Sequence, residues 1–96
     1  MASYVILVNW TEEGVRTFRD TVERADSVAQ LMQQLGGQMT NLYWTLGAYD
    51  LVAICEAPDD ETATAASLAI SSQGYVRTAT MRAFTREEMT GILAKL

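Results

Sequence analysis

The sequence predicts an α+β fold in which strands and helices follow one another in the order βαββαβ, with one more helix at the end. Two observations predict it. Segments rich in β-branched and aromatic residues alternate with segments whose apolar residues recur every three or four positions. Glycines and acidic helix-capping signals mark the boundaries between them. Composition agrees, since 49% of the 96 residues are hydrophobic and 20% are charged. We expect residues 1–96 to form one domain.

The first half of the chain predicts a strand, a long helix and a hairpin. Residues 4–10 are typical of a strand, and Thr11 can cap the helix that follows. This helix is expected to reach Gly36-Gly37, and its sequence leaves open a break near residues 20–23. Strands are expected at about 38–46 and 49–57, with a hairpin turn at Gly47-Ala48. The helix would bury the apolar face formed by Val15, Phe18, Val22, Ala25, Ala29, Met32 and Leu35.

The second half predicts a helix, a strand and a terminal helix. Pro58-Asp-Asp-Glu61 is a helix-start signal, and the alanine-rich helix after it should end near Gly74. Residues 75–84 have the alternating character of a strand. Thr85-Arg-Glu-Glu88 forms a capping box for the last helix. The apolar stripe of that helix comprises Met89, Ile92, Leu93 and Leu96.

Two interleaved βαβ halves define the ferredoxin-like sandwich, a four-stranded antiparallel sheet with strand order 4-1-3-2 and helices on one face. The third strand nevertheless carries apolar residues at both parities, with Leu51 and Ala53 on one side and Val52 and Ile54 on the other. Helices on one face would leave the second set exposed to water. We therefore expect a partner to cover it, most simply a second copy in a homodimer or a higher even-numbered oligomer.

Composition excludes several classes of function. Net charge is −5, with 12 acidic and 7 basic residues, so a nucleic-acid-binding face is not expected. No apolar run approaches the about 20 residues that span a bilayer, and no signal peptide opens the chain, so we expect a cytoplasmic protein without membrane contact. Histidine is absent, which removes the usual nucleophilic triads and zinc ligand sets. We expect no metal and no cofactor.

Four ordered motifs resemble those of the GYD domain family. The hallmark Gly-x-Tyr-Asp lies within Tyr43-Trp-Thr-Leu-Gly-Ala-Tyr-Asp50. Val22 departs from the family, which often has proline there, and this affects only the local helix break. The other three motifs are Tyr4-x-x-Leu7-x-x-Trp10-Thr11-x-x-Gly14, Ala57-Pro-Asp-Asp60 and Gly74-x-Val-Arg-Thr-x-Thr-x-Arg-Ala-Phe84.

The resemblance implies a ferredoxin-like domain of the dimeric α+β barrel group, in which two sheets pack face to face. Members of the GYD family are largely uncharacterised. The wider group contains cofactor-free oxygenases, isomerases, effector-binding modules and stress-response proteins, so fold alone does not select a function.

The predicted topology gathers mixed aromatic and polar residues at one edge of the sheet, where the first two strands end and the last two begin. One carboxylate and one guanidinium among aromatic rings suit a small-molecule pocket, which needs about 300 Å³ or more. The opposite edge receives a plainer set that includes Tyr4, Thr40, Glu56 and Phe84. The candidate ligand-binding residues are Asn9, Trp10, Trp44, Thr45, Tyr49, Asp50 and Arg77, with Tyr75 beside them.

Each candidate also has a structural interpretation. Asp50 can accept backbone N–H bonds or pair with Arg77, and the tryptophans can anchor a core or an interface. Strand parity separates Tyr49 from Asp50. Arg24 can form a surface ion pair or reach into the cleft between helices and sheet. Cys55 is expected to act as a small buried hydrophobe, and the acids at 59–61 to cap a helix.

Three functions remain open. The protein can be a homo-oligomeric module that binds a small organic molecule, which we favour because absent histidine weakens catalysis more than recognition. It can be a cofactor-free oxygenase or isomerase, with Asn9 and Trp44 orienting substrate, Tyr49 or Asp50 handling protons, and Arg77 stabilising negative charge. It can also be a purely structural assembly unit.

Overall fold

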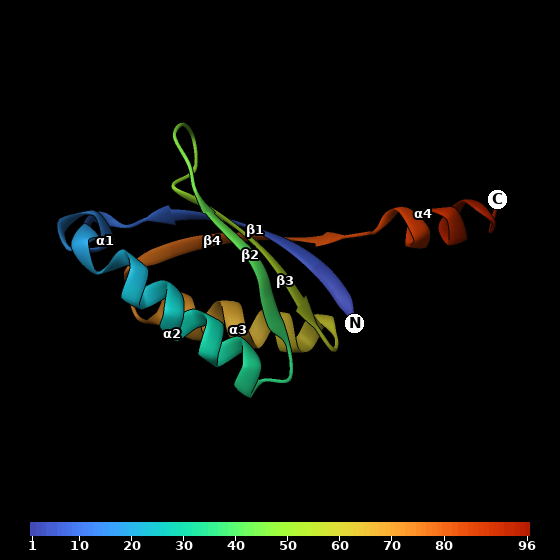
Figure 1. Cartoon of the computed structure of the whole chain (residues 1–96), viewed down its shortest axis with the longest axis horizontal. Helices are drawn as coiled ribbons and strands as arrows, with labels where there is room; N and C mark the ends of the chain where they lie inside the picture. The colour runs from blue at the N-terminus through green and yellow to red at the C-terminus, as the bar shows by residue number, and fades with distance from the viewer.

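The computed structural model describes residues 1–96 and confirms the predicted α+β topology (Figure 1). The four strands form one antiparallel sheet in the order β2-β3-β1-β4, as predicted. The elements are β1 (Ala2–Trp10), α1 (Glu12–Arg16), the 3-10 helix η1 (Phe18–Asp20), α2 (Thr21–Gln34), β2 (Gln38–Trp44), β3 (Leu51–Ala57), α3 (Asp60–Ser72), β4 (Val76–Ala83) and α4 (Arg86–Leu93).

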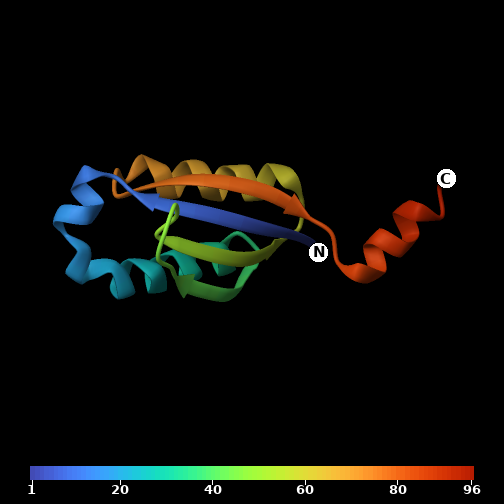
Figure 2. The ribbon, with the colours of Figure 1, turned by 90° about the horizontal axis from the view of Figure 1, so that it is seen from above.

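Helices α2 and α3 cover one face of the sheet and leave the other open (Figures 1 and 2). The register settles which residues face each way, because side chains alternate along a strand. Ala53 and Cys55 of β3 are buried under the helices, beside Tyr4 of β1. Val52 and Ile54 therefore lie on the open face.

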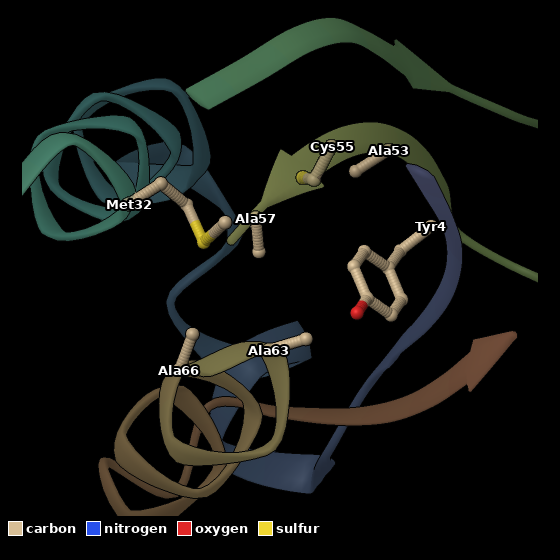
Figure 3. Close-up of a cluster of buried hydrophobic side chains, with 7 residues drawn as sticks. All are labelled: Tyr4, Met32, Ala53, Cys55, Ala57, Ala63 and Ala66. Atoms are coloured by element: carbon tan, nitrogen blue, oxygen red, sulfur yellow. The ribbon is translucent and has the colours of Figure 1, made fainter. Parts of the chain in front are cut away.

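The buried core is built largely from small side chains (Figure 3). Only 10 of the 96 residues are buried, so few large groups fill the space between the layers. Met32 is the one long aliphatic side chain that reaches the centre from α2. The core cluster consists of Tyr4, Met32, Ala53, Cys55, Ala57, Ala63 and Ala66.

The long helix expected before Gly36 is divided into α1, η1 and α2, and the division lies at residues 17–20. Thr11 N donates to the carbonyl oxygen of Tyr75 (3.0 Å), which holds α1 against the start of β4. Helix α2 instead runs along the sheet near β2, so the chain must change direction between them (Figure 2). The predicted apolar face is consequently wrong in its first part, where Val15, Phe18 and Val22 are half-exposed or more.

The connection between β2 and β3 is longer than the predicted turn at Gly47-Ala48. Strand β2 ends at Trp44 and β3 begins at Leu51, so residues 45–50 form a loop. Hydrogen bonds within the loop take the place of the further β2–β3 pairing that the sequence predicts. Thr45 N donates to the carbonyl oxygen of Asp50 (2.9 Å), and Thr45 Oγ1 donates to the carbonyl oxygen of Tyr49 (2.6 Å). The loop rises on the side of the sheet away from α2 and α3 (Figure 1).

Helix α4 extends away from the sandwich as a C-terminal arm (Figures 1 and 2). The predicted capping box is confirmed, because Glu88 N donates to Thr85 Oγ1 and Thr85 N donates to the Glu88 carboxylate. The pKa of the Glu88 carboxyl is lowered chiefly by that bond from the Thr85 backbone. The apolar stripe of α4 is mostly exposed, with Leu93 at 56%.

Gly14 marks the tightest approach between the first helical segment and β4. A Cβ at this position would lie 2.0 Å from the carbonyl oxygen of Tyr75, a backbone atom that Thr11 already holds. We predict that Gly14→Ala lowers the free energy of unfolding by about 1–3 kcal/mol through overpacking. Urea unfolding measures this change.

The matched control is Gly91→Ala in α4, where an added Cβ meets nothing within 4 Å. Alanine is the better helix former, so this variant should keep or raise stability. Equal stability of the two variants would contradict the close approach.

Candidate ligand-binding site

A cavity of about 80 Å³ lies between the two covering helices and the sheet. Helix α3 runs beside β4 and α2 beside β2, so the central strands lie between the two helices in this view (Figure 2). The facing alanines of β3 and α3 are too short to fill the gap (Figure 3). Most residues that line the cavity are hydrophobic, including Ile6, Val8, Trp10, Val28, Leu42 and Ile70.

Arg24 is the single charged residue among those that line the cavity. Its guanidinium carbon lies 3.9 Å from the centre of the Tyr75 ring. Nη2 donates to the hydroxyl of Thr17 and lies 3.6 Å from a carboxylate oxygen of Asp20. Nη1 is buried and has no acceptor. Arg24 thus combines both roles considered from sequence, an ion pair and a place in the cleft.

The two tryptophans lie on the side of the sheet that faces the helices. Trp10 lines the cavity, while Trp44 is 44% exposed. The indole Nε1 of Trp44 donates to Thr21 Oγ1 (3.0 Å), which ties β2 to the first turn of α2. Thr21 also lines the cavity. This bond therefore fixes the helix turn from which Arg24 projects.

The other candidate residues lie away from the cavity. Asn9 and Arg77 are cross-strand neighbours on the open face, and Arg77 is exposed. Thr45, Tyr49 and Asp50 belong to the loop between β2 and β3, which rises on that same side (Figure 1). Because Tyr49 and Asp50 lie before β3 begins, the strand parity expected to separate them does not apply. The structure therefore divides the predicted cluster between the two faces of the sheet.

Asp50 holds the end of the β1–β3 ladder. Its carboxylate accepts a hydrogen bond from Trp10 N (2.9 Å), and its own N–H donates to the carbonyl oxygen of Val8 (2.9 Å). No ion pair joins it to Arg77. Its geometry matches the first of the two structural roles considered from sequence, acceptance of a backbone N–H.

A polar cluster at the opposite edge was not recognised from sequence. The Tyr4 hydroxyl donates to Asp60 (2.5 Å), and Arg82 lies 3.9 Å from Asp60 and 3.5 Å from Glu88. Burial, reinforced by the bond to Asp60, raises the pKa of Tyr4 to about 12, so the phenol stays protonated. A groove of about 380 Å³ between α3 and β4 runs past these residues, lined mainly by hydroxyl groups of Thr64, Ser67, Thr78 and Thr80.

Cys55 and the acids of α3 have the structural roles expected of them. Cys55 is 2% exposed, and burial raises its thiol pKa to about 11, which keeps it protonated at neutral pH. Asp59 caps α3 by accepting from Thr62 N (2.8 Å), and its hydrogen bonds with Thr62 lower the pKa of its carboxyl. No three metal-ligating side chains lie close enough together to hold an ion.

This architecture defines the class of protein, an α+β sandwich of the ferredoxin-like type with one open sheet face. The chain belongs to the GYD domain family, whose model matches residues 4–93. The resemblance inferred from the motifs is thus confirmed. None of the helices combines the length and the hydropathy that crossing a bilayer requires.

Similarity to this chain, both in sequence and in fold, is found in Thermus thermophilus. The glutamine synthetase and cystathionine beta-lyase binding protein is 34% identical over 84 residues, a match that covers 86% of this chain and 88% of that protein. The crystal structure of TTHA0845 superposes with a TM-score of 0.57 at 25% identity, covering 88% of this chain and 95% of that chain.

We predict that Asp50→Ala destabilises the protein by about 1–3 kcal/mol, because Trp10 N loses its acceptor at the end of the ladder. Asp50→Asn keeps one carbonyl oxygen in place and should cost less. Urea unfolding gives both values, and hydrogen exchange at the Trp10 amide should accelerate in the alanine variant.

Asp26→Ala is the matched control, since Asp26 is an exposed carboxylate on α2 that makes no hydrogen bond or ion pair. Should Asp50→Ala cost no more than this control, the carboxylate would have no structural role.

Proposed function

We propose that this GYD-domain protein is a self-associating module that binds a small molecule in the cleft between α2, α3 and the sheet. The observation that carries this proposal is the apolar cavity, whose lining includes Arg24 as its one charged residue. Well-packed cores hold few voids larger than one water, which needs about 10–15 Å³. A cavity of about 80 Å³ exceeds that severalfold.

The size of the cavity limits the ligand. It is smaller than the about 300 Å³ typical of drug-sized sites, so the ligand is compact or buries only its apolar part there. Apolar cavities of modest size stay dry and take up small apolar molecules. The groove beside β4 is larger but polar, and its Arg82 is already paired with two carboxylates.

Self-association is proposed for the open face of the sheet. Val52 and Ile54 lie at its centre without helices above them, and Tyr43 and Met81 are 58% and 46% exposed. Contiguous apolar surface of this kind marks interaction sites. A second copy would cover it by packing sheet against sheet, as the dimeric α+β barrel group does.

Protein binding is a second candidate, favoured by the similarity to the glutamine synthetase and cystathionine beta-lyase binding protein of Thermus thermophilus. On this alternative the open face binds an enzyme such as glutamine synthetase or cystathionine beta-lyase. Binding of either purified enzyme that is lost in Ile54→Lys would support it. Absence of binding to both enzymes would count against it.

Indole tests the small-molecule proposal, because it is compact and largely apolar. We predict saturable methyl shifts at Ala63, Ala66 and Ile6 in two-dimensional NMR titrations. Ala66→Leu should weaken binding at least tenfold, since the larger side chain extends from α3 into the cavity. Ala65→Leu is the control, because Ala65 is exposed on the same helix.

The proposal fails if indole leaves the cleft signals of the wild type unchanged. It also fails if Ala66→Leu, with its fold verified by the same spectra, binds as tightly as Ala65→Leu.

A further inference from the structure

We infer that the ligand of the cleft is a small carboxylate with a short apolar tail, whose anionic group binds Arg24. This inference rests on the proposed function and specifies its ligand class. Arg24 is the one charged residue that lines the cleft, and most of the other lining residues are hydrophobic, so the cleft favours a molecule with one charged end.

The free donor on Arg24 is the first reason. Nη1 is buried without an acceptor, although buried donors in proteins are almost always paired. An anionic oxygen is the strongest partner for a guanidinium N–H. The positive charge of Arg24 is only weakly compensated, which supports this choice. Its one acidic neighbour, Asp20, is 3.6 Å away and its side chain is 60% exposed, so solvent screens the ion pair.

The guanidinium is also held ready for a ligand. The Tyr75 ring stacks against it at 3.9 Å, and the hydroxyl of Thr17 accepts from Nη2. The side chain is only 20% exposed, so it has little freedom left to lose. Pre-organisation of this kind reduces the cost of binding.

The apolar walls extend from this anchor along α2. Arg24 lies near the start of α2, and Met32 lies eight positions further along on the same side, which is about 12 Å at the helical rise. Val28 lies between them, and Ala66 of α3 faces the same space. A carboxylate at Arg24 would thus direct a short chain toward the core cluster (Figure 3).

Hexanoate and 1-hexanol form the test pair, since they share an apolar chain and differ in charge. Isothermal titration calorimetry on the full chain should show hexanoate binding at least tenfold more tightly than hexanol. Arg24→Met should abolish this preference while hexanol binding persists, and Arg24→Lys should keep part of it. Arg19→Met is the control, because Arg19 is an exposed cation on η1 outside the cavity.

Three outcomes overturn the inference. Equal affinity for hexanoate and hexanol would refute the anionic anchor and leave the small-molecule proposal standing. A preference that persists in Arg24→Met would place the anion elsewhere. If neither compound nor indole binds in the cleft, the proposed function fails as well. Methyl spectra verify that each variant is folded. If Arg24→Met does not fold, Arg24→Lys still tests the anchor, because it keeps the positive charge.

Discussion

The structure depends on a sheet that has apolar residues on both faces and helices on only one. Helices α2 and α3 pack mainly against the outer strands β2 and β4 and less against the central strands. Small residues such as Ala53 and Ala66 allow close approach but do not fill the middle. One face therefore contains a cleft, and the other presents Val52 and Ile54 to a partner. Both proposals follow from this one constraint.

Local signals were sufficient for most of the fold. The cap at Asp59, the capping box at Thr85 and the alternation in β3 each specify a boundary or a face through short-range chemistry. The division of the first helix could not be predicted in the same way. It depends on the close approach of Thr11 and Gly14 to the carbonyl oxygen of Tyr75, which is about 60 residues away in the sequence.

The candidate site was harder to predict than the fold. The predicted topology brings Asn9, Trp10 and Asp50 to one edge of the sheet. Alternation along a strand separates residues onto two faces, but it does not say which face the helices cover. The hydrogen bond from Trp10 N to Asp50 and the stacking of Arg24 on Tyr75 both require three-dimensional placement. The sequence gives no sign of the polar cluster around Tyr4, because its partners Asp60 and Arg82 lie on a helix and within another strand.

Native mass spectrometry of the purified protein tests most directly whether the two faces of the sheet have separate roles. The wild type should appear as a dimer or a higher even-numbered oligomer at micromolar concentration. Ile54→Lys should appear as a folded monomer, since a charge at the centre of the open face would oppose burial. A monomeric wild type under the same conditions would contradict the account.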